Sequence, residues 1–388
     1  MVINPFKPTL GATPPALVGR EAVLDEFRFA LRNGPGTHER VSVVTGPRGI
    51  GKTTLLNAVE DLAAEEGWVF FSETATTGFV NRLIAQAMKE LAGFSSSRRV
   101  SGAGVQVMGT GVNVQFESQP GMAQLELRSV LTELLDHIDE RDKKFGQHTG
   151  LLITLDELHH LQRKEVIDLA TAVQHLVREN RNISLVMAGI PSSVVPLLAN
   201  EDGNNPITFL RRANRVVLGN VSDSYVRVGL EKPVTDAGYR WEGPALDSAV
   251  NACAGYPFLI QLVGQYSFAN ASDGVVTASS AESGIETARR KIGQLVHEPA
   301  LADLSDTDRT FLIAMSQDDG PSAIRDIAER LHVSPQYANT YRKRLIEAEM
   351  IESTERGFVD FTLPYIREYL REHYAQHVFF DTDGESDA

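Results

Sequence analysis

One run of residues has the composition and spacing of a phosphate-binding loop, with the pattern G-x-x-x-x-G-K-[ST]: Gly46-Pro47-Arg48-Gly49-Ile50-Gly51-Lys52-Thr53. Its glycines let backbone N–H groups turn toward phosphate oxygens, because no Cβ stands in the way. Lys52 can reach the β- and γ-phosphates, and the Thr53 hydroxyl can ligate Mg²⁺. The helix that follows, with Thr54 in its first turn, adds the positive end of its dipole. The run therefore predicts that ATP and Mg²⁺ bind at residues 46–54.

Two carboxylates, Asp156 and Glu157, directly follow a buried apolar run at Leu151–Leu155. Charge at the end of such a run needs a reason, because burying it is costly. Asp156 is predicted to hold the water shell of Mg²⁺, and Glu157 to polarise the water that attacks the γ-phosphate. A helix cap is the alternative for an isolated pair of this kind. Beside a phosphate loop the pair favours hydrolysis.

Short β-branched runs alternate with amphipathic helices in the first half of the chain. Strands are expected at 41–45, 68–71, 151–155, 183–188 and 216–218, and helices from Glu21, after the phosphate loop, over 79–92 and over 125–138. This alternation predicts an α/β fold with three layers, in which helices cover both faces of a parallel sheet. Apolar residues alternate on either side of 108–111, which predicts an inserted β-hairpin at about 99–118. Surface decoration and partner binding are both open for that hairpin.

The combination of these two motifs, with a strand–helix unit between them, resembles the additional-strand ATPases. Within that group the chain resembles the AAA+ and STAND families, including the archaeal-type and origin-recognition-like AAA ATPases. Leu17-Val18-Gly19-Arg20-Glu21 is similar to a segment that runs beside adenine in those families, so the resemblance implies nucleotide contacts at Gly19 and Arg20. Gly255-Tyr256-Pro257 resembles the G-x-P of STAND and archaeal-type lids, whose proline approaches the nucleotide; that residue is Pro257 here.

Arg211 and Arg212 stand where initiator-type AAA+ proteins often carry an arginine finger. The resemblance implies that they act across an ATP-dependent homo-oligomer; surface charge at a helix C-terminus is the alternative. Two features depart from the AAA+ pattern. The strand Val186–Pro191 has no Asn or Thr at the usual sensor position, and the lid has Gly-Tyr-Pro in place of a sensor arginine. Both departures favour a STAND-like or archaeal-type switch.

Residues 300–380 have a helix-helix-helix-hairpin pattern that resembles a winged helix-turn-helix, with Ser334 and Pro335 at the start of the third helix. Residues of that helix off its buried stripe are candidates for contact with double-stranded DNA: Gln336, Asn339, Thr340 and Lys343 would face the bases, and Arg342 and Arg344 would lie near phosphates. Residues 301–388 contain nine Lys and Arg against eighteen Asp and Glu. We therefore expect DNA binding to be weak and salt-dependent, and packing against the rest of the chain is the alternative.

Composition indicates two or three soluble domains in the 388 residues, and the net charge of −14 leaves nucleic acid only a local basic face to bind. A single cysteine, Cys253, fits a reducing cytoplasm, and no apolar run approaches the ~20 residues that would span a membrane. We expect a cytoplasmic protein with this organisation: an extended arm at 1–15, an ATPase domain at 16–220, a helical lid at 221–297, a winged helix at 300–380 and a disordered acidic tail at 381–388.

The predicted function is an ATPase whose nucleotide state sets the arrangement of the α/β domain, lid and winged helix, with DNA as a candidate partner. A STAND-type scaffold or signalling protein that binds nucleotide but no DNA is the first alternative. A P-loop phosphotransferase is the second. Glu157 directly after Asp156 favours hydrolysis over transfer, because a kinase needs its base at an acceptor pocket.

Overall fold

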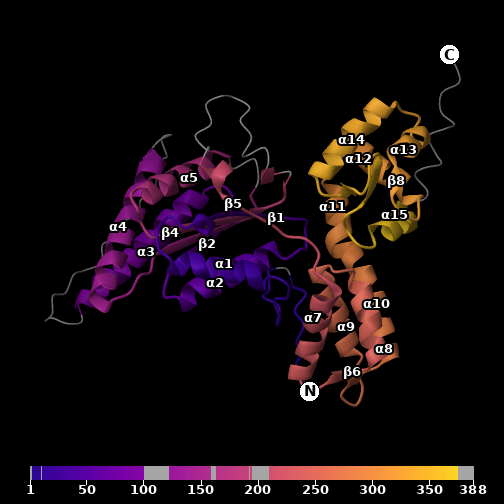
Figure 1. Ribbon diagram of the computed structural model, residues 1–388, viewed down its shortest axis with the longest axis horizontal. Coiled ribbons are helices and arrows are strands. Elements are labelled where there is room, and N and C mark those ends of the chain that lie inside the picture. Colours follow the sequence, from indigo (N-terminus) through magenta and orange to yellow (C-terminus); the bar gives the residue numbers. More distant parts are fainter. Residues whose placement is uncertain are drawn as a thin grey trace.

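The computed structural model describes residues 2–9, 11–99, 122–158, 163–191, 193–194 and 209–374. The expected insertion beyond Arg99 and the acidic tail lie outside these ranges. Three parts follow one another along the chain: an α/β part (residues 16–217), a helical part (223–302) and a C-terminal part (306–374). The α/β part forms one lobe, and the other two stack to form a second lobe (Figure 1). None of the helices in the described ranges is long and apolar enough to cross a bilayer.

The α/β part is built on a sheet of five parallel strands in the order β2-β3-β4-β1-β5. The strands are β1 Val41–Thr45, β2 Val69–Thr74, β3 Leu151–Asp156, β4 Ile183–Gly189 and β5 Asn214–Val217. β4 lies between β1, which precedes the phosphate loop, and β3, which ends in the carboxylates. The five expected strands are confirmed, although β2 runs three residues beyond its expected end.

Helices cover both faces of this sheet, which makes three layers. One face carries α1 Glu21–Arg32 and α2 Lys52–Glu65; the other carries α3 Phe79–Arg99, α4 Met122–Phe145 and α5 Arg163–Arg178. Adjacent strand residues, such as Val43 and Val44, enter opposite cores because side chains alternate along a strand. The predicted three-layer α/β fold is therefore confirmed.

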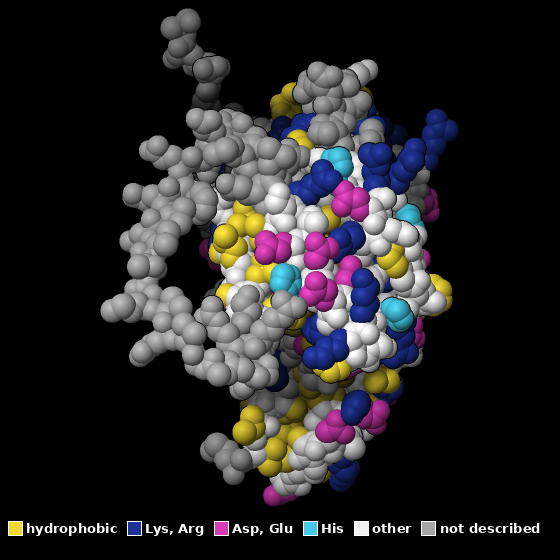
Figure 2. Space-filling model, turned by 90° about the vertical axis from the view of Figure 1, so that its left-hand side faces the viewer, with side chains coloured by type: hydrophobic (Ala, Val, Ile, Leu, Met, Phe, Trp, Pro, Cys, Tyr) yellow, Lys and Arg dark blue, Asp and Glu magenta, His cyan; other side chains and the backbone are white. Residues whose placement is uncertain are grey.

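The outer face of α4 and α5 shows basic and acidic side chains intermixed (Figure 2). Arg181 pairs with Asp136 at 2.7 Å and with Asp139 at 3.2 Å, and Arg128 pairs with Glu179. Alternating signs of this kind give no continuous positive surface for a phosphate backbone.

The helical part follows the sheet through residues 218–222. Its elements are α7 Asp223–Asp236, β6 Arg240–Trp241, α8 Gly243–Cys253, α9 Pro257–Ala269, β7 Val275–Val276 and α10 Ala278–Ile292. A π-turn, η5 Gly293–His297, and a short helix, α11 Glu298–Ala302, continue α10 without leaving helical backbone angles. This continuous helical path leads into the C-terminal part.

The C-terminal part packs helices against a small antiparallel sheet with the order β8-β10-β9. Its elements are α12 Asp306–Ser316, β8 Ser322–Ala323, α13 Ile324–Arg330, α14 Pro335–Glu347, β9 Ile351–Ser353, β10 Phe358–Phe361 and α15 Ile366–Tyr374. Ser334 caps α14, since its side chain accepts a hydrogen bond from the N–H of Tyr337, and Pro335 is the first helical residue.

Candidate functional site

The phosphate loop joins β1 to α2, and its glycines occupy positions that other residues would strain. Gly46, Gly49 and Gly51 have φ of +154°, +72° and +97°. A Cβ on Gly46 would lie 2.6 Å from the carbonyl oxygen of Leu218, and a Cβ on Gly49 would lie 2.1 Å from the Tyr256 hydroxyl oxygen. Only glycine fits both the backbone angles and these close approaches.

Lys52 begins α2 and folds back over the loop. Its Nζ donates hydrogen bonds to the carbonyls of Gly46 at 2.5 Å and Pro47 at 2.9 Å. An ammonium group has three donors, so one remains for an anion. Burial lowers the pKa of Lys52 to about 8, and nearby carboxylates oppose that change. A partly buried cation at a helix N-terminus is suited to hold phosphate oxygens.

The ends of β1 and β3 lie at the same edge of the sheet, and this brings the two motifs together. The Thr53 hydroxyl donates to Asp156 Oδ2 at 2.6 Å, and the N–H of Glu157 donates to Asp156 Oδ1 at 2.8 Å. A hydroxyl and a carboxylate oxygen held this close are the hard oxygen donors that Mg²⁺ prefers. Glu157 is exposed and has φ of +54°, which turns the chain at the strand end.

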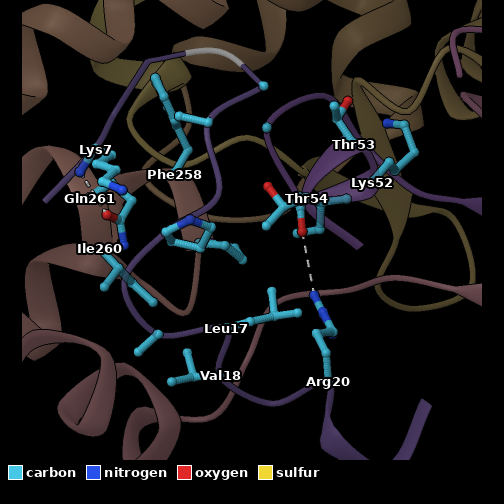
Figure 3. A pocket seen from close by; sticks show the side chains of 18 of the residues that line it. Lys7, Leu17, Val18, Arg20, Lys52, Thr53, Thr54, Phe258, Ile260 and Gln261 are labelled. Carbon is cyan, nitrogen blue, oxygen red and sulfur yellow. Dashed lines mark hydrogen bonds between the residues drawn. The ribbon is translucent and has the colours of Figure 1, made fainter. Parts of the chain in front are cut away.

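A cavity of about 160 Å³ lies beside the loop (Figure 3). Apolar side chains such as Leu17 and Phe258 gather on one side of it, and Thr53 and Thr54 lie on the other. It is lined by part of the N-terminal arm, by residues 16–18 and 20, by residues 49–54 of the loop, and by residues 257, 258, 260 and 261 of α9. The structure thus places most of the predicted nucleotide-binding residues around one space.

Arg20 and Pro257, singled out by family resemblance, both line this cavity. Arg20 donates to the carbonyls of Gly219 at 2.6 Å and Ile50 at 3.5 Å, so it ties the segment before α1 to the loop. Pro257 is the first residue of α9. Gly19 directly precedes Arg20 but does not itself line the cavity. Its φ is +68°, and a Cβ on it would lie 2.9 Å from a side-chain carbon of Val221.

Three contacts at the site come from residues to which the sequence assigned no role. The Tyr256 hydroxyl donates to the carbonyl of Arg48, and Tyr256 is 1% exposed, which raises the pKa of its phenol. The N-terminal arm runs along α9, where the N–H of Lys7 donates to Gln261 Oε1 at 3.1 Å. Asp303 of the segment after α11 pairs with Arg48 at 2.5 Å. The arm and Asp303 carry no sequence signal, whereas Tyr256 sits inside the quoted Gly-Tyr-Pro segment.

Comparison with known proteins agrees with this geometry. Residues 16–186 match the family model of the AAA ATPase domain. The protein is a P-loop ATPase. A solved structure of a Walker-type ATPase of Pyrococcus abyssi is similar over 92% of this chain and 96% of its own, with a TM-score of 0.62 and 14% identity. At that identity, the fold is what the two chains share.

The remaining comparisons add less about the ATPase. Residues 294–370 match a domain of unknown function (DUF8462), and no curated protein matches the chain. A variant of RuvB from Thermotoga maritima is 15% identical and covers 94% of this chain and 98% of its own, with a TM-score of 0.46. PCH-2 of C. elegans reaches 0.39 at 14% identity over 70% of this chain and 67% of its own. Scores this low do not indicate a common overall fold.

The two candidate finger residues lie away from the cavity of the ATPase. Arg211 and Arg212 are exposed on a 3₁₀ turn, η4 Leu210–Arg212, directly before the edge strand β5. Neither lines the cavity within the described part of the chain. That they act on the nucleotide of a neighbouring subunit therefore stays a prediction.

The candidate DNA-contacting residues of α14 are largely exposed. Gln336, Asn339, Thr340 and Lys343 face solvent. Arg342 is half-buried and donates to Ser353 Oγ at 2.7 Å. Arg344 pairs with the buried Asp308 at 2.7 Å, so this cation is already engaged within the C-terminal part.

Proposed function

We propose that the ATPase is a molecular switch, in which the bound nucleotide sets how the helical and C-terminal parts sit on the phosphate loop. The observation that carries this proposal is that Arg48 is contacted by the helical part and by the segment that joins this part to the C-terminal part, which lines a cavity together with Arg48. Tyr256 bonds its carbonyl, and Asp303 pairs with its guanidinium. A change in the loop when the γ-phosphate arrives or leaves would therefore reach both parts. We propose the domain limits 16–220, 221–297 and 300–380 for the three parts that this switch would couple.

In this proposal, ATP lies with its phosphates on residues 46–53 and its base in the cavity between Arg20 and Pro257. Lys52 turns its remaining donor to the β- and γ-phosphates. Mg²⁺, held by Thr53 and through water by Asp156, would neutralise phosphate charge. Glu157 orients the attacking water and takes up its proton, because an exposed carboxylate beside Asp156 can reach a water at the γ-phosphate.

Hydrolysis by the full chain tests these roles. We expect Mg²⁺-dependent phosphate release that falls by about 10²–10⁴-fold in Glu157→Gln, since general-base catalysis contributes that much. The variant should still bind ATP. Glu179→Gln, which removes an exposed carboxylate far from the loop, is the control. Equal turnover by wild type and Glu157→Gln would refute the assignment.

For the C-terminal part we propose a winged helix, with α14 as the candidate recognition helix and the β9–β10 hairpin as the wing. The exposed polar residues of α14 support DNA as a partner; the engaged Arg344 and the excess of acidic residues support a docking role instead. Anisotropy titrations with duplex DNA at low salt separate the two. Loss of binding in Lys343→Ala, but not in the control Arg325→Ala on α13, would favour DNA. Equal binding by both variants, or none by wild type, would favour the scaffold alternative.

A further inference from the structure

The C-terminal part covers one side of the phosphate loop. Asp303, in the segment just before the C-terminal part, pairs with Arg48, and a cavity of about 150 Å³ lies between the α/β and C-terminal parts. Arg48 and Ile190 line it from the α/β part, and Glu349 and Met350 line it from the C-terminal part. The turn that follows α14 is therefore a neighbour of the nucleotide site.

Backbone contacts fix the position of Glu349 within that turn. Its φ is +57°, which non-glycine residues adopt at some cost. Its N–H donates to the carbonyl of Ile346 at 3.0 Å, and its own carbonyl accepts a hydrogen bond from the Thr362 hydroxyl. Met350, the next residue, is 4% exposed in the core. The side chain of Glu349 is thus carried to a defined place beside the loop.

The Glu349 carboxylate is poorly satisfied at this place. Its Oε2 is buried and lacks a hydrogen-bond partner among the described residues. Burial raises the pKa of Glu349 to about 7, and the charge of Lys52 opposes that rise. A buried carboxylate oxygen without a hydrogen-bond partner costs free energy, so a nearby group that favours the charged carboxylate is expected.

Glu349 faces Lys52. Burial lowers the pKa of Lys52, and Glu349 opposes that change more strongly than Asp156 or Glu157 does. Within the described ranges no ion pair within 4.0 Å joins Lys52 and Glu349, so the two charges act on each other through space. The Glu349 carboxylate of the C-terminal part therefore competes with phosphate for the positive charge of Lys52.

We infer that Glu349 discriminates between ADP and ATP: while the C-terminal part is docked, its carboxylate disfavours a γ-phosphate beside Lys52. This inference rests on the proposed function. ADP places its last charge deeper in the loop, on backbone N–H groups, and is compatible with the docked part. ATP adds a phosphate next to Lys52 and so repels Glu349. By linkage, ATP must weaken docking by the same factor by which docking weakens ATP.

The test is calorimetry of the full chain with Mg·ADP and with the Mg complex of a β,γ-imido ATP analogue. We expect wild type to bind ADP more tightly than the analogue. In Glu349→Gln the analogue should gain about tenfold in affinity, a usual size for such coupling, and ADP should change less than about twofold. Glu347→Gln, an exposed carboxylate two residues earlier, is the matched control and should behave as wild type.

A second variant guards against misfolding of the turn. Asp303→Asn removes the ion pair with Arg48 but keeps Glu349, and by loosening docking it should also favour the analogue over ADP. An unchanged preference in Glu349→Gln, or an equal gain for both nucleotides, would overturn the inference while leaving the ATPase assignment intact. Failure of wild type to bind either nucleotide would overturn the proposed function and this inference with it.

Discussion

We predict that the buried His297 lowers the stability of the helical and C-terminal parts as the pH falls. It ends the π-turn η5 and is fully buried. Its Nε2 lies 2.9 Å from the carbonyl oxygen of Pro364, and its ring meets Tyr369 edge-on at 5.3 Å. Nδ1 is buried without a partner among the described residues, so a second proton there would have no acceptor. Burial accordingly lowers the pKa of His297 to about 4.

The sign and size of the effect follow by linkage. Well above pH 6.5 the imidazole is neutral in both the folded and the unfolded chain, so its burial does not lower the free energy of unfolding there. As the pH falls from 6.5 toward 4, the unfolded chain binds a proton that the folded chain refuses, so stability decreases. A pKa difference between 6.5 and about 4 implies a loss of about 2 kcal/mol at pH 5 and a limit of about 3 kcal/mol. Glu349, whose pKa is raised, works in the opposite direction.

Because these contributions oppose each other, the assay compares a variant with wild type rather than one pH with another. His297→Gln keeps a donor for Pro364 but does not titrate. Urea unfolding is followed by tryptophan fluorescence in a Trp68→Phe background, so that the signal comes from Trp241, which is buried in the helical part. Between pH 7.5 and pH 5 wild type should lose about 2 kcal/mol more than the variant, or roughly 1 M urea in the midpoint.

His38→Gln, an exposed histidine of the α/β part, is the control and should follow wild type. The comparison does not depend on the absolute stability of the variant, because only its pH dependence is used. If His297→Gln and wild type lose the same free energy on acidification, the histidine is not held neutral by burial and the reasoning fails.

Three further results are expected. Lys52→Ala should weaken ATP binding by about 100-fold, as expected for loss of a charge paired with phosphate; unchanged affinity in calorimetry, with exposed Lys232→Ala as control, would contradict this. Gly49→Ala should disrupt the loop through its clash with Tyr256, whereas Gly34→Ala, with similar φ but open space, should cost only about 1 kcal/mol; equal melting temperatures would argue against the clash. The double variant Arg211→Ala, Arg212→Ala should reduce turnover only where ATP drives oligomers, and sedimentation that shows monomer alone would exclude that role.

The sheet and the phosphate loop could be predicted because their signals are local. Val41–Thr45 and Leu151–Asp156 are short, largely apolar runs typical of strands buried in a parallel sheet, and the glycine pattern of the loop reflects backbone angles that the structure contains. The helix that begins at Phe79 could be placed but its end at Arg99 could not, since the polar residues at its end carry no amphipathic signal.

Contacts between distant segments could not be predicted. Tyr256 and Arg48 are 208 residues apart, and nothing in either segment indicates that a lid phenol bonds a loop carbonyl. In sequence, Glu349 is indistinguishable from Glu347 and Glu352; only the turn after α14 and the docking of the C-terminal part make it partly buried. Nothing in the sequence of the N-terminal arm indicates its contacts: Asn4 and Lys7 bond to α9 of the helical part, and the carbonyl of Gly11 accepts a hydrogen bond from Asn57 of α2.

The contacts on the phosphate loop also indicate which parts should move together. The helical and C-terminal parts are joined by contacts that involve no residue of the phosphate loop: Tyr365 donates to the carbonyl of Ala252 at 2.6 Å and lies under the guanidinium of Arg289, and His297 lies against Pro364. Their charged contacts with the loop, at Arg48 and Lys52, are the ones that a γ-phosphate opposes. ATP should therefore shift both parts as one body, and the chain between β5 and α7, which Arg20 holds at Gly219, is the connection about which that body would turn.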